Sequence, residues 1–287
     1  MVDGVAVIDK PAGWTSHDAV AKARGVLGTR KVGHGGTLDP DATGVLVLGV
    51  GRATRLLRYV TALPKSYEAE IVLGVETDTL DSSGRVTARH DMAGVSAEQA
   101  REAAAALTGE ILQTPPMVSA VKVGGRRLHT LARAGVEVER EARPVTVHRF
   151  EVAPVPGAEA VLRAVVDCSS GTYVRVLAAD LGRALGGGAH LRNLRRTAVG
   201  SFGLACARPL ESADLLPMAH AVKHLAGVRV GPEVAAEVAH GRVLDTERLG
   251  ATGDGPWAVH DTEGGLLAVY ERFRTGAKPA VVVVAVT

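Results

Sequence analysis

The stretch Gly33–Val45, GHGGTLDPDATGV, runs directly into an apolar segment at residues 44–51, GVLVLGVG, and together they decide how the N-terminal half is interpreted. Glycines at positions 33, 35 and 36 permit backbone geometries closed to other residues and the close approach of a ligand. The continuous apolar segment predicts a strand that is covered on both faces. The Asp39-Pro40 turn therefore places a carboxylate at the end of a buried strand.

Asp39 has more than one interpretation on local grounds. A carboxylate at such a position often only caps a turn. The stretch is not a phosphate-binding loop, because it lacks GK[ST] and does not fit G-x-G-x-x-G. Asp41 is expected to point toward solvent, and the alternative is a paired-carboxylate acid–base site with Asp39.

The composition indicates a globular protein of about two domains. The chain has 287 residues, of which 46% are hydrophobic and 22% charged, so it can bury a core. Two distant cysteines form no CxxC pair, and the ten histidines form no HxxxH or HExxH motif, so no metal is expected. The longest apolar run, Ala280–Val286, is too short to span a bilayer, and a cytoplasmic protein is expected.

Positive charge is concentrated in two segments, although the formal net charge is only +2. Residues 171–208 contain six arginines against one aspartate, and residues 111–150 contain seven cations against three glutamates. Such segments indicate a localised footprint for a polyanion. A solvated arginine-rich surface is the alternative.

The periodicity predicts alternating strands and helices on both sides of the quoted stretch. A strand at 4–9 precedes a helix that Thr15 or Ser16 caps and Gly28 ends. Further strands are predicted at 67–73, 145–155 and 161–168, and helices at 53–63, at 97–108 after a capping box, and from about 175 to 185. A helix at 232–239 and strands at 257–259, 266–270 and 281–286, separated by GDG, EGG and GAKP turns, predict a compact β-rich C-terminal module.

A second informative motif is CSSGTYVR, residues 168–175. An arginine just inside a helix is usually a surface residue. Arg175 could instead pair with a buried carboxylate and keep it ionised.

Five blocks in order resemble the bacterial tRNA pseudouridine-55 synthase family, over roughly residues 4–210. They are GVAVIDKPAGWTSHDAV (4–20), GHGGTLDPDATGVL (33–46), PKSY (64–67), residues 113–135, and CSSGTYVRVLAADLGRALGGGAHLRNLRRTAVGSFG (168–203). The GTLDP and GTYVR motifs are specific to this group and its close relatives. The C-terminal module resembles the RNA-binding PUA domain.

The resemblance implies a role for individual residues. Asp39 matches the catalytic aspartate, Tyr67 the tyrosine that stacks on the target base, and Arg175 the arginine that pairs with the aspartate. The residues expected to bind substrate or RNA are His34, Lys10 of the KPxG motif, Tyr173, Leu194, Gly36, Thr37, Lys122 and Arg126. Val118 and His129 stand where many relatives carry tyrosine, which puts the grip on RNA in more doubt than catalysis.

The resemblance also implies a fold and a partner. The expected fold class is α/β (α+β), with a mixed, mostly antiparallel sheet in a catalytic domain at 1–226, a thumb-like insertion at about 112–144, and a PUA-like domain at 227–287. The expected activity converts a uridine in the T-arm of tRNA, position 55, to pseudouridine by base flipping and without a cofactor. The expected partner is the tRNA T-arm stem-loop, and a monomer without a membrane or an obligate protein partner is expected.

Two alternatives stay open. The chain could be a non-catalytic RNA-binding or tRNA-folding module that uses the same cleft. It could also be a catalytic subunit guided by a separate RNA, although the thumb-like insertion favours an enzyme that acts alone.

Overall fold

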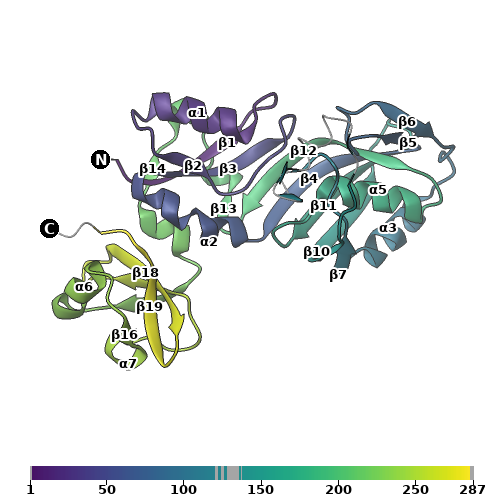
Figure 1. Ribbon diagram of the computed structural model, residues 1–287. Helices are drawn as coiled ribbons and strands as arrows, with labels where there is room; N and C mark the ends of the chain where they lie inside the picture. The colour runs from purple at the N-terminus through teal and green to yellow at the C-terminus, as the bar shows by residue number, and fades with distance from the viewer. Residues whose placement is uncertain (1, 120–121, 124–125, 128–135, 137, 285–287) are drawn as a thin grey trace.

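The computed structural model describes residues 2–119, 122–123, 126–127, 136 and 138–284. The described residues form two main sheets, which lie beside one another in an elongated molecule (Figure 1). A ten-stranded sheet uses residues up to Leu216, and a five-stranded sheet begins at Ala226. Among the described residues, no helix has the length and apolarity needed to cross a membrane.

The N-terminal part of the large sheet is buried on both faces. Its central pair is β1 (Gly4–Lys10) and β3 (Thr43–Val50), which run antiparallel, with β14 (Leu215–Leu216) and β2 (Val32–His34) beside them. Helix α1 (Ser16–Val26) covers one face, and η1 (Gly51–Leu56) with α2 (Leu57–Ala62) covers the other. The prediction of a strand covered on both faces is confirmed, and this double coverage explains the uninterrupted apolar run at 44–51.

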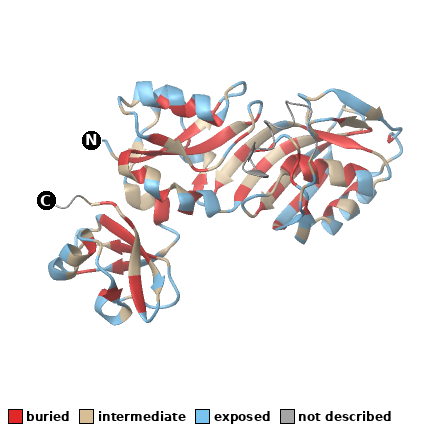
Figure 2. Ribbon diagram, viewed as in Figure 1, coloured by how far each residue is buried: buried red, intermediate tan, exposed pale blue. Residues whose placement is uncertain are grey.

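The remaining strands of the large sheet are antiparallel to one another. Their order is β12 (Ala189–Val199), β4 (Lys65–Leu73), β11 (Val161–Cys168), β10 (Arg143–Pro154) and β7 (Gly109–Gln113). Helices α3 (Ala97–Ala106) and α5 (Val174–Ala184) pack on one face, and α3 begins with the predicted capping box of Ser96 and Gln99. The opposite face is less covered, because buried and partly exposed residues alternate along β4. Figure 2 shows how burial is distributed over the elements.

The two parts of the large sheet meet through one short parallel contact. Strand β12 pairs with β3 at only two positions, Arg195 with Thr43 and Arg196 with Gly44. The expected mixed, mostly antiparallel sheet is therefore confirmed. Because the contact is short, side chains as well as the ladder must hold the two parts together.

Shorter elements complete the described fold. They are β5 (Val75–Thr77), β6 (Val86–Arg89), β8 (Lys122–Val123), β9 (Arg126–Arg127), β13 (Phe202–Gly203), η2 (Leu204–Cys206), η3 (Leu210–Ser212) and η4 (Met218–Val222). Part of the predicted thumb-like insertion, including His129, lies outside the described residues.

The second sheet has its own apolar centre and also shares one with the large sheet. Its order is β15 (Ala226–Arg229), β17 (Trp257–His260), β18 (Leu266–Phe273), β19 (Gly276–Val282) and β16 (Leu244–Asp245), with α6 (Pro232–Ala239) and α7 (Thr246–Leu249). Trp257 and Tyr270 are fully buried within it. Val269 and Val281 from this sheet share an apolar cluster with Leu56 and Val60 of the first.

One C-terminal strand differs from its prediction. The sequence predicts a GAKP turn followed by a strand at 281–286, but β19 already begins at Gly276 and ends at Val282. Pro279 is accommodated at an irregularity, because the pairing of β18 with β19 shifts register between Val269 and Tyr270.

Candidate active site

The loop that carries Asp39 joins β2 to β3, and its backbone is fixed on both sides of the aspartate. The buried Ser16 hydroxyl accepts a hydrogen bond from Leu38 N at 2.9 Å and donates one to Leu38 O at 3.1 Å. The Lys10 ammonium donates to Pro40 O at 3.0 Å, and the amide of Gly13 donates to the same oxygen at 2.9 Å. The carboxylate is therefore held in a defined place, with 38% of its side chain exposed.

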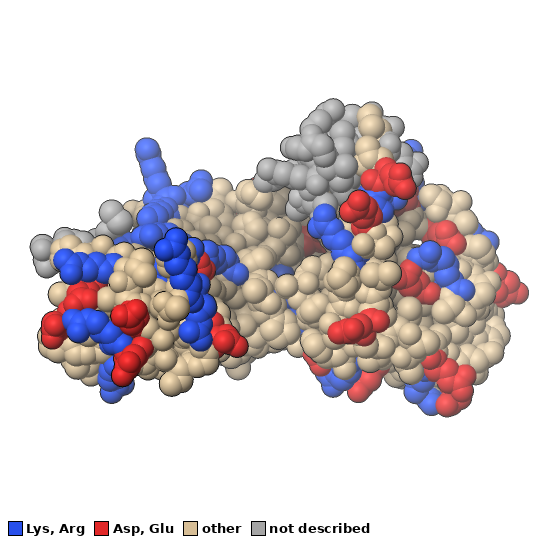
Figure 3. Space-filling model, turned by 60° about the horizontal axis from the view of Figure 1, so that its bottom comes forward, with Lys and Arg blue, Asp and Glu red and all other residues tan. Residues whose placement is uncertain are grey.

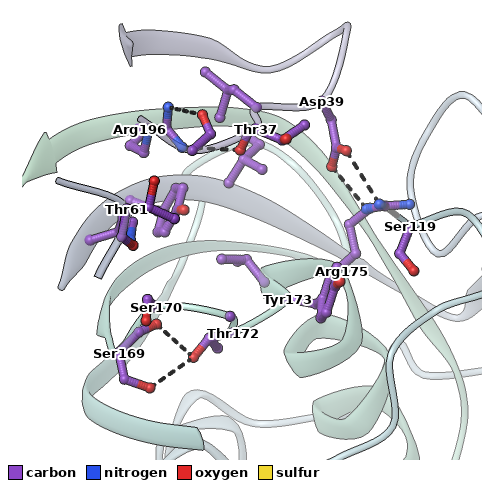
Figure 4. Close-up of a pocket in the computed structure, with 17 residues that line it drawn as sticks. Thr37, Asp39, Thr61, Ser119, Ser169, Ser170, Thr172, Tyr173, Arg175 and Arg196 are labelled. Carbon is purple, nitrogen blue, oxygen red and sulfur yellow. Dashed lines mark hydrogen bonds and ion pairs between the residues drawn. The ribbon is translucent and has the colours of Figure 1, made fainter. Parts of the chain in front are cut away.

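Arg196 holds the preceding part of the same loop. Its guanidinium donates to Gly36 O at 3.3 Å, to Thr37 O at 3.2 Å and to Val45 O at 2.7 Å. The side chain is buried, at 1% exposure, and it lies beside the loop of Asp39 in Figure 4. In the sequence, Arg196 is only one of six arginines in a basic segment. Its role cannot be predicted there, because its carbonyl partners lie some 150 positions away and leave no sequence signal.

Asp39 forms the ion pair that the resemblance implied. Arg175, near the start of α5, places Nε 3.0 Å from Asp39 Oδ2 and Nη2 3.3 Å from Oδ1. The arginine side chain is only 5% exposed. Its remaining donors reach Thr79 O at 2.9 Å and Val118 O at 3.0 Å, so the guanidinium is held in one orientation.

A second carboxylate, Asp81, shares the same arginine. Its Oδ2 lies 3.3 Å from Arg175 Nη1, and its Oδ1 accepts hydrogen bonds from Thr79 and Ser83. No sequence motif singles out Asp81, which lies in a polar loop between β5 and β6.

The pKa of Asp39 is raised above the ordinary value of a carboxyl group. Burial is the largest cause, and the negative charge of Asp81 adds to it. Arg175 and, more weakly, Lys10 act in the opposite direction. The ion pair therefore offsets much of the effect of burial without cancelling it.

A pocket of about 430 Å³ opens beside the Asp39–Arg175 pair. The loop of Asp39 forms one wall and the segment 169–175 forms another, with Tyr173 at the start of α5 (Figure 4). Lining residues that the sequence predicted are Gly36, Thr37, Asp39, Tyr67, Tyr173, Arg175 and Leu194. Lining residues that it did not predict as site residues include Thr61, Lys65, Ser119, Ser169 and Arg196.

Tyr67 lies in β4 with its side chain almost completely buried against the apolar core. Burial raises the pKa of its hydroxyl, and the neighbouring Arg196 guanidinium lowers it. Lys65, two residues earlier, donates to Thr61 O and to Leu63 O, and burial lowers its pKa to about 8. Tyr67, Lys65 and Arg196 all line the pocket.

Lys10 does not suit its predicted contact with RNA. The side chain is 0% exposed, and its ammonium donates to Pro11 O, Trp14 O and Pro40 O at 2.7–3.0 Å. All three of its hydrogens are thereby used. Contact of Lys10 with RNA therefore stays a prediction that this burial does not favour, because burial is not visible in a KPxG motif. In the structure Lys10 fixes the loop of Asp39.

Other predicted RNA-binding residues either do not line the pocket or have side chains outside the described part of the chain. His34 is absent from the pocket lining, and its ring lies edge-on to His17 with centroids 5.3 Å apart. Its Nδ1 is buried and finds no hydrogen-bond partner among the described residues. The backbones of Lys122 and Arg126 lie in β8 and β9, but their side chains are outside the described part of the chain.

The basic segment 171–208 is less available than its charge suggested. Arg192 pairs with Glu70 at 2.6 Å and Arg195 with Asp9 at 2.7 Å, while Arg175 and Arg196 are buried. Arg183 pairs with Asp180. Figure 3 shows Lys and Arg gathered at the upper left of one face, whereas acidic and basic side chains mix at the lower left and on the right. The polyanion footprint at 171–208 is therefore a weaker prediction than the sequence implied.

Comparison with solved structures finds chains of similar fold. A chain in the crystal structure of a Cbf5–Nop10–Gar1 complex superposes with a TM-score of 0.74 and 27% identity, over 99% of this chain and 84% of that one. A chain of an archaeal box H/ACA sRNP Nop10–Cbf5 complex gives 0.74 and 25%, over 98% and 86%. The long sheet with its attached smaller sheet is thus a shared architecture.

Family models give the class of protein, a pseudouridylate synthase. The model of the TruB family pseudouridylate synthase N-terminal domain matches residues 24–174, and that of the tRNA pseudouridylate synthase B C-terminal domain matches residues 175–226. The chain belongs to the TruB family.

Curated relatives agree over nearly the whole length. Proteins named tRNA pseudouridine synthase B from Arthrobacter sp. (strain FB24) and Thermobifida fusca (strain YX) are each 46% identical. The matches cover 98% of this chain and 97% and 99% of those proteins. The protein of that name from Mycobacterium sp. (strain KMS) is 47% identical over 93% of this chain and 92% of its own.

Proposed function

We propose that this chain converts uridine 55 in the T-arm of tRNA to pseudouridine, with Asp39 as the essential carboxylate. Membership of the TruB family supports the reaction, as do relatives named tRNA pseudouridine synthase B that match over nearly the full length. The observation that supports the role of Asp39 is its place at a pocket, partly exposed and held by a buried arginine. A carboxylate packed solidly in the core or on a convex surface could do no such chemistry.

The reaction is an isomerisation, so it balances without a co-reactant. The bond between ribose C1′ and uracil N1 breaks, the base turns, and a bond forms between C1′ and C5. The proton on C5 leaves for solvent, and N1 gains a proton. The detached uracil must stay in place while it turns, which requires a closed pocket. A volume of about 430 Å³ suits one nucleoside.

The pocket residues divide the work. Asp39 reacts as an anion, either as a nucleophile or as a base at the sugar. Arg175 keeps that anion oriented and favours its charged form. Tyr67 and Leu194 supply the apolar wall against which the everted base stacks, a contact worth roughly 1–3 kcal/mol per base. That contact offsets the few kcal/mol that unstacking costs.

The enzyme is proposed to act alone, as a monomer in the cytoplasm. The solved Cbf5 structures are of complexes, so a guided subunit is the alternative. The family model of the C-terminal domain and the curated relatives are of tRNA pseudouridine synthase B instead. The division into domains at 1–226 and 227–287, with RNA binding by the second, stays part of this proposal.

The test is the reaction of the purified chain with an unmodified tRNA transcript. Pseudouridine at position 55, mapped by carbodiimide adducts and primer extension, is the expected product. A transcript with cytidine at position 55 is the matched control and should give no product. Binding of the transcript without pseudouridine would favour the non-catalytic RNA-binding alternative and contradict the proposal.

A further inference from the structure

Arg196 stands where the two parts of the large sheet meet. In the ladder it pairs with Gly44 of β3 on one side and with Tyr67 of β4 on the other. The β3 side leads directly to the loop of Asp39, and the β4 side carries the proposed stacking residue. One residue is therefore in register with both halves of the pocket.

Close packing fixes the backbone at this junction. Gly44 has φ +103°, and a Cβ on it would lie 2.2 Å from Arg196 O and 2.9 Å from Arg196 N. Only glycine allows β3 to approach Arg196 so closely. The guanidinium then extends to Gly36 O, Thr37 O and Val45 O, and it contributes to the pocket lining.

The charge of Arg196 needs a reason beyond a clamp. Arginine stays protonated when buried, and a buried ion carries a desolvation penalty of several kcal/mol. Neighbouring Arg195 is balanced by Asp9, but within the described part of the chain the Arg196 guanidinium contacts backbone carbonyls and no carboxylate. Neutral donors could hold those carbonyls. The positive charge therefore acts on something else in the pocket. Tyr67 is paired with Arg196 in the ladder, and its hydroxyl is the acidic group whose pKa the guanidinium lowers.

We infer that Arg196 is a positioning residue that sets Asp39 and Tyr67 against the same nucleoside. Its guanidinium donors fix the loop of Asp39, and its positive charge orients and polarises the Tyr67 hydroxyl. The inference rests on the proposed reaction. It assigns no direct contact with RNA to Arg196, so the effect of substitution falls on the chemical step and not on affinity.

Two substitutions separate the hydrogen-bond geometry of the guanidinium from its charge. Arg196→Lys keeps the positive charge but loses the planar set of donors. Arg196→Gln keeps neutral donors but loses the charge. We expect each to slow single-turnover formation of pseudouridine by on the order of 10²-fold, as displacement of a reacting group by about 1 Å does. Affinity for tRNA, measured by filter binding, should change less than about threefold. Arg163→Gln, which removes an exposed arginine of the same sheet paired with Glu68, is the control and should keep the wild-type rate.

A spectroscopic readout distinguishes this role from a merely structural one. The chain has four tyrosines, so 3-fluorotyrosine gives four ¹⁹F resonances, and Tyr67→Phe identifies the one of interest. In Arg196→Gln this resonance should titrate at higher pH than in the wild type, because a nearby positive charge favours phenolate. In Arg196→Lys the titration should stay near the wild-type position.

The outcomes are distinct. A folded Arg196→Gln with the wild-type rate, or with an unmoved Tyr67 titration, overturns the inference. If Arg196→Gln does not fold by circular dichroism, Arg196→Lys decides, and a folded lysine variant at the wild-type rate overturns it. A wild-type protein that makes no pseudouridine refutes the proposed reaction instead, which separates the two failures.

Discussion

At the scale of single residues, the site is a balance around one carboxylate. Burial and Asp81 raise the pKa of Asp39, while Arg175 lowers it. The sequence motifs located Asp39 and Arg175, because each lies in a specific block, and the ion pair between them is confirmed. Asp81 could not be found in the same way, because its contact with Arg175 depends on how the β5–β6 loop folds back.

This balance predicts opposite pH shifts for two substitutions. Asp39 works as an anion, so the single-turnover rate falls as pH drops through its pKa. Asp81→Asn removes a negative neighbour and lowers that pKa, so the acid limb of the pH profile should move to lower pH. Arg175→Met removes the positive neighbour, so the limb should move to higher pH, with a rate loss on the order of 10²-fold at pH 7. Acid limbs that coincide in all three proteins would contradict this assignment.

At the scale of elements, the active site is a loop pinned by three side chains from other elements. Lys10 comes from β1, Ser16 from α1 and Arg196 from β12. The helix cap at Thr15 or Ser16 and the apolar run at 44–51 were readable from the sequence, since both are local patterns. The pins were not, because each bonds to main-chain atoms distant in sequence.

Lys10→Met tests whether this lysine positions the loop or binds RNA. Three carbonyl groups lose their ammonium partner, so the free energy of unfolding should fall by about 2 kcal/mol in urea titrations. The single-turnover rate should also fall. The dependence of tRNA affinity on salt should stay unchanged, whereas loss of a phosphate contact would reduce the slope by about 1. A reduced salt dependence of tRNA affinity, together with wild-type stability, would instead support direct contact of Lys10 with RNA.

Gly44→Ala tests the β3–β12 contact. The added Cβ meets Arg196 O at 2.2 Å with φ at +103°, so the variant should lose about 3 kcal/mol of stability. Gly227→Ala is the matched control, because nothing lies within 4 Å of its Cβ and its φ is not positive. Equal urea midpoints for the two variants would show that the junction tolerates a side chain.

At the scale of the whole molecule, the two sheets are joined by a common apolar cluster. Val269 and Val281 of the second sheet lie in one cluster with Leu56 and Val60 of the first. Sequence periodicity predicted that a β-rich module follows the catalytic part, but it could not show this shared packing. It also misplaced the last strand, because Gly276 and Pro279 are turn formers that here lie within β19.

Shared packing predicts that the two sheets unfold together. The chain has two tryptophans, Trp14 beside α1 and the fully buried Trp257 in the second sheet. Each single-tryptophan protein, Trp257→Phe or Trp14→Phe, should show the same urea midpoint by fluorescence as by far-ultraviolet circular dichroism. Separate midpoints within one variant would mean that the sheets unfold independently.

The central claim is tested most directly by tritium release from tRNA labelled at uracil C5. Asp39→Asn should release no tritium while binding tRNA as the wild type does, and Asp41→Asn, with its exposed side chain two residues away, should release it at the normal rate. Release by Asp39→Asn at the wild-type rate would contradict the assignment of the reaction to this carboxylate.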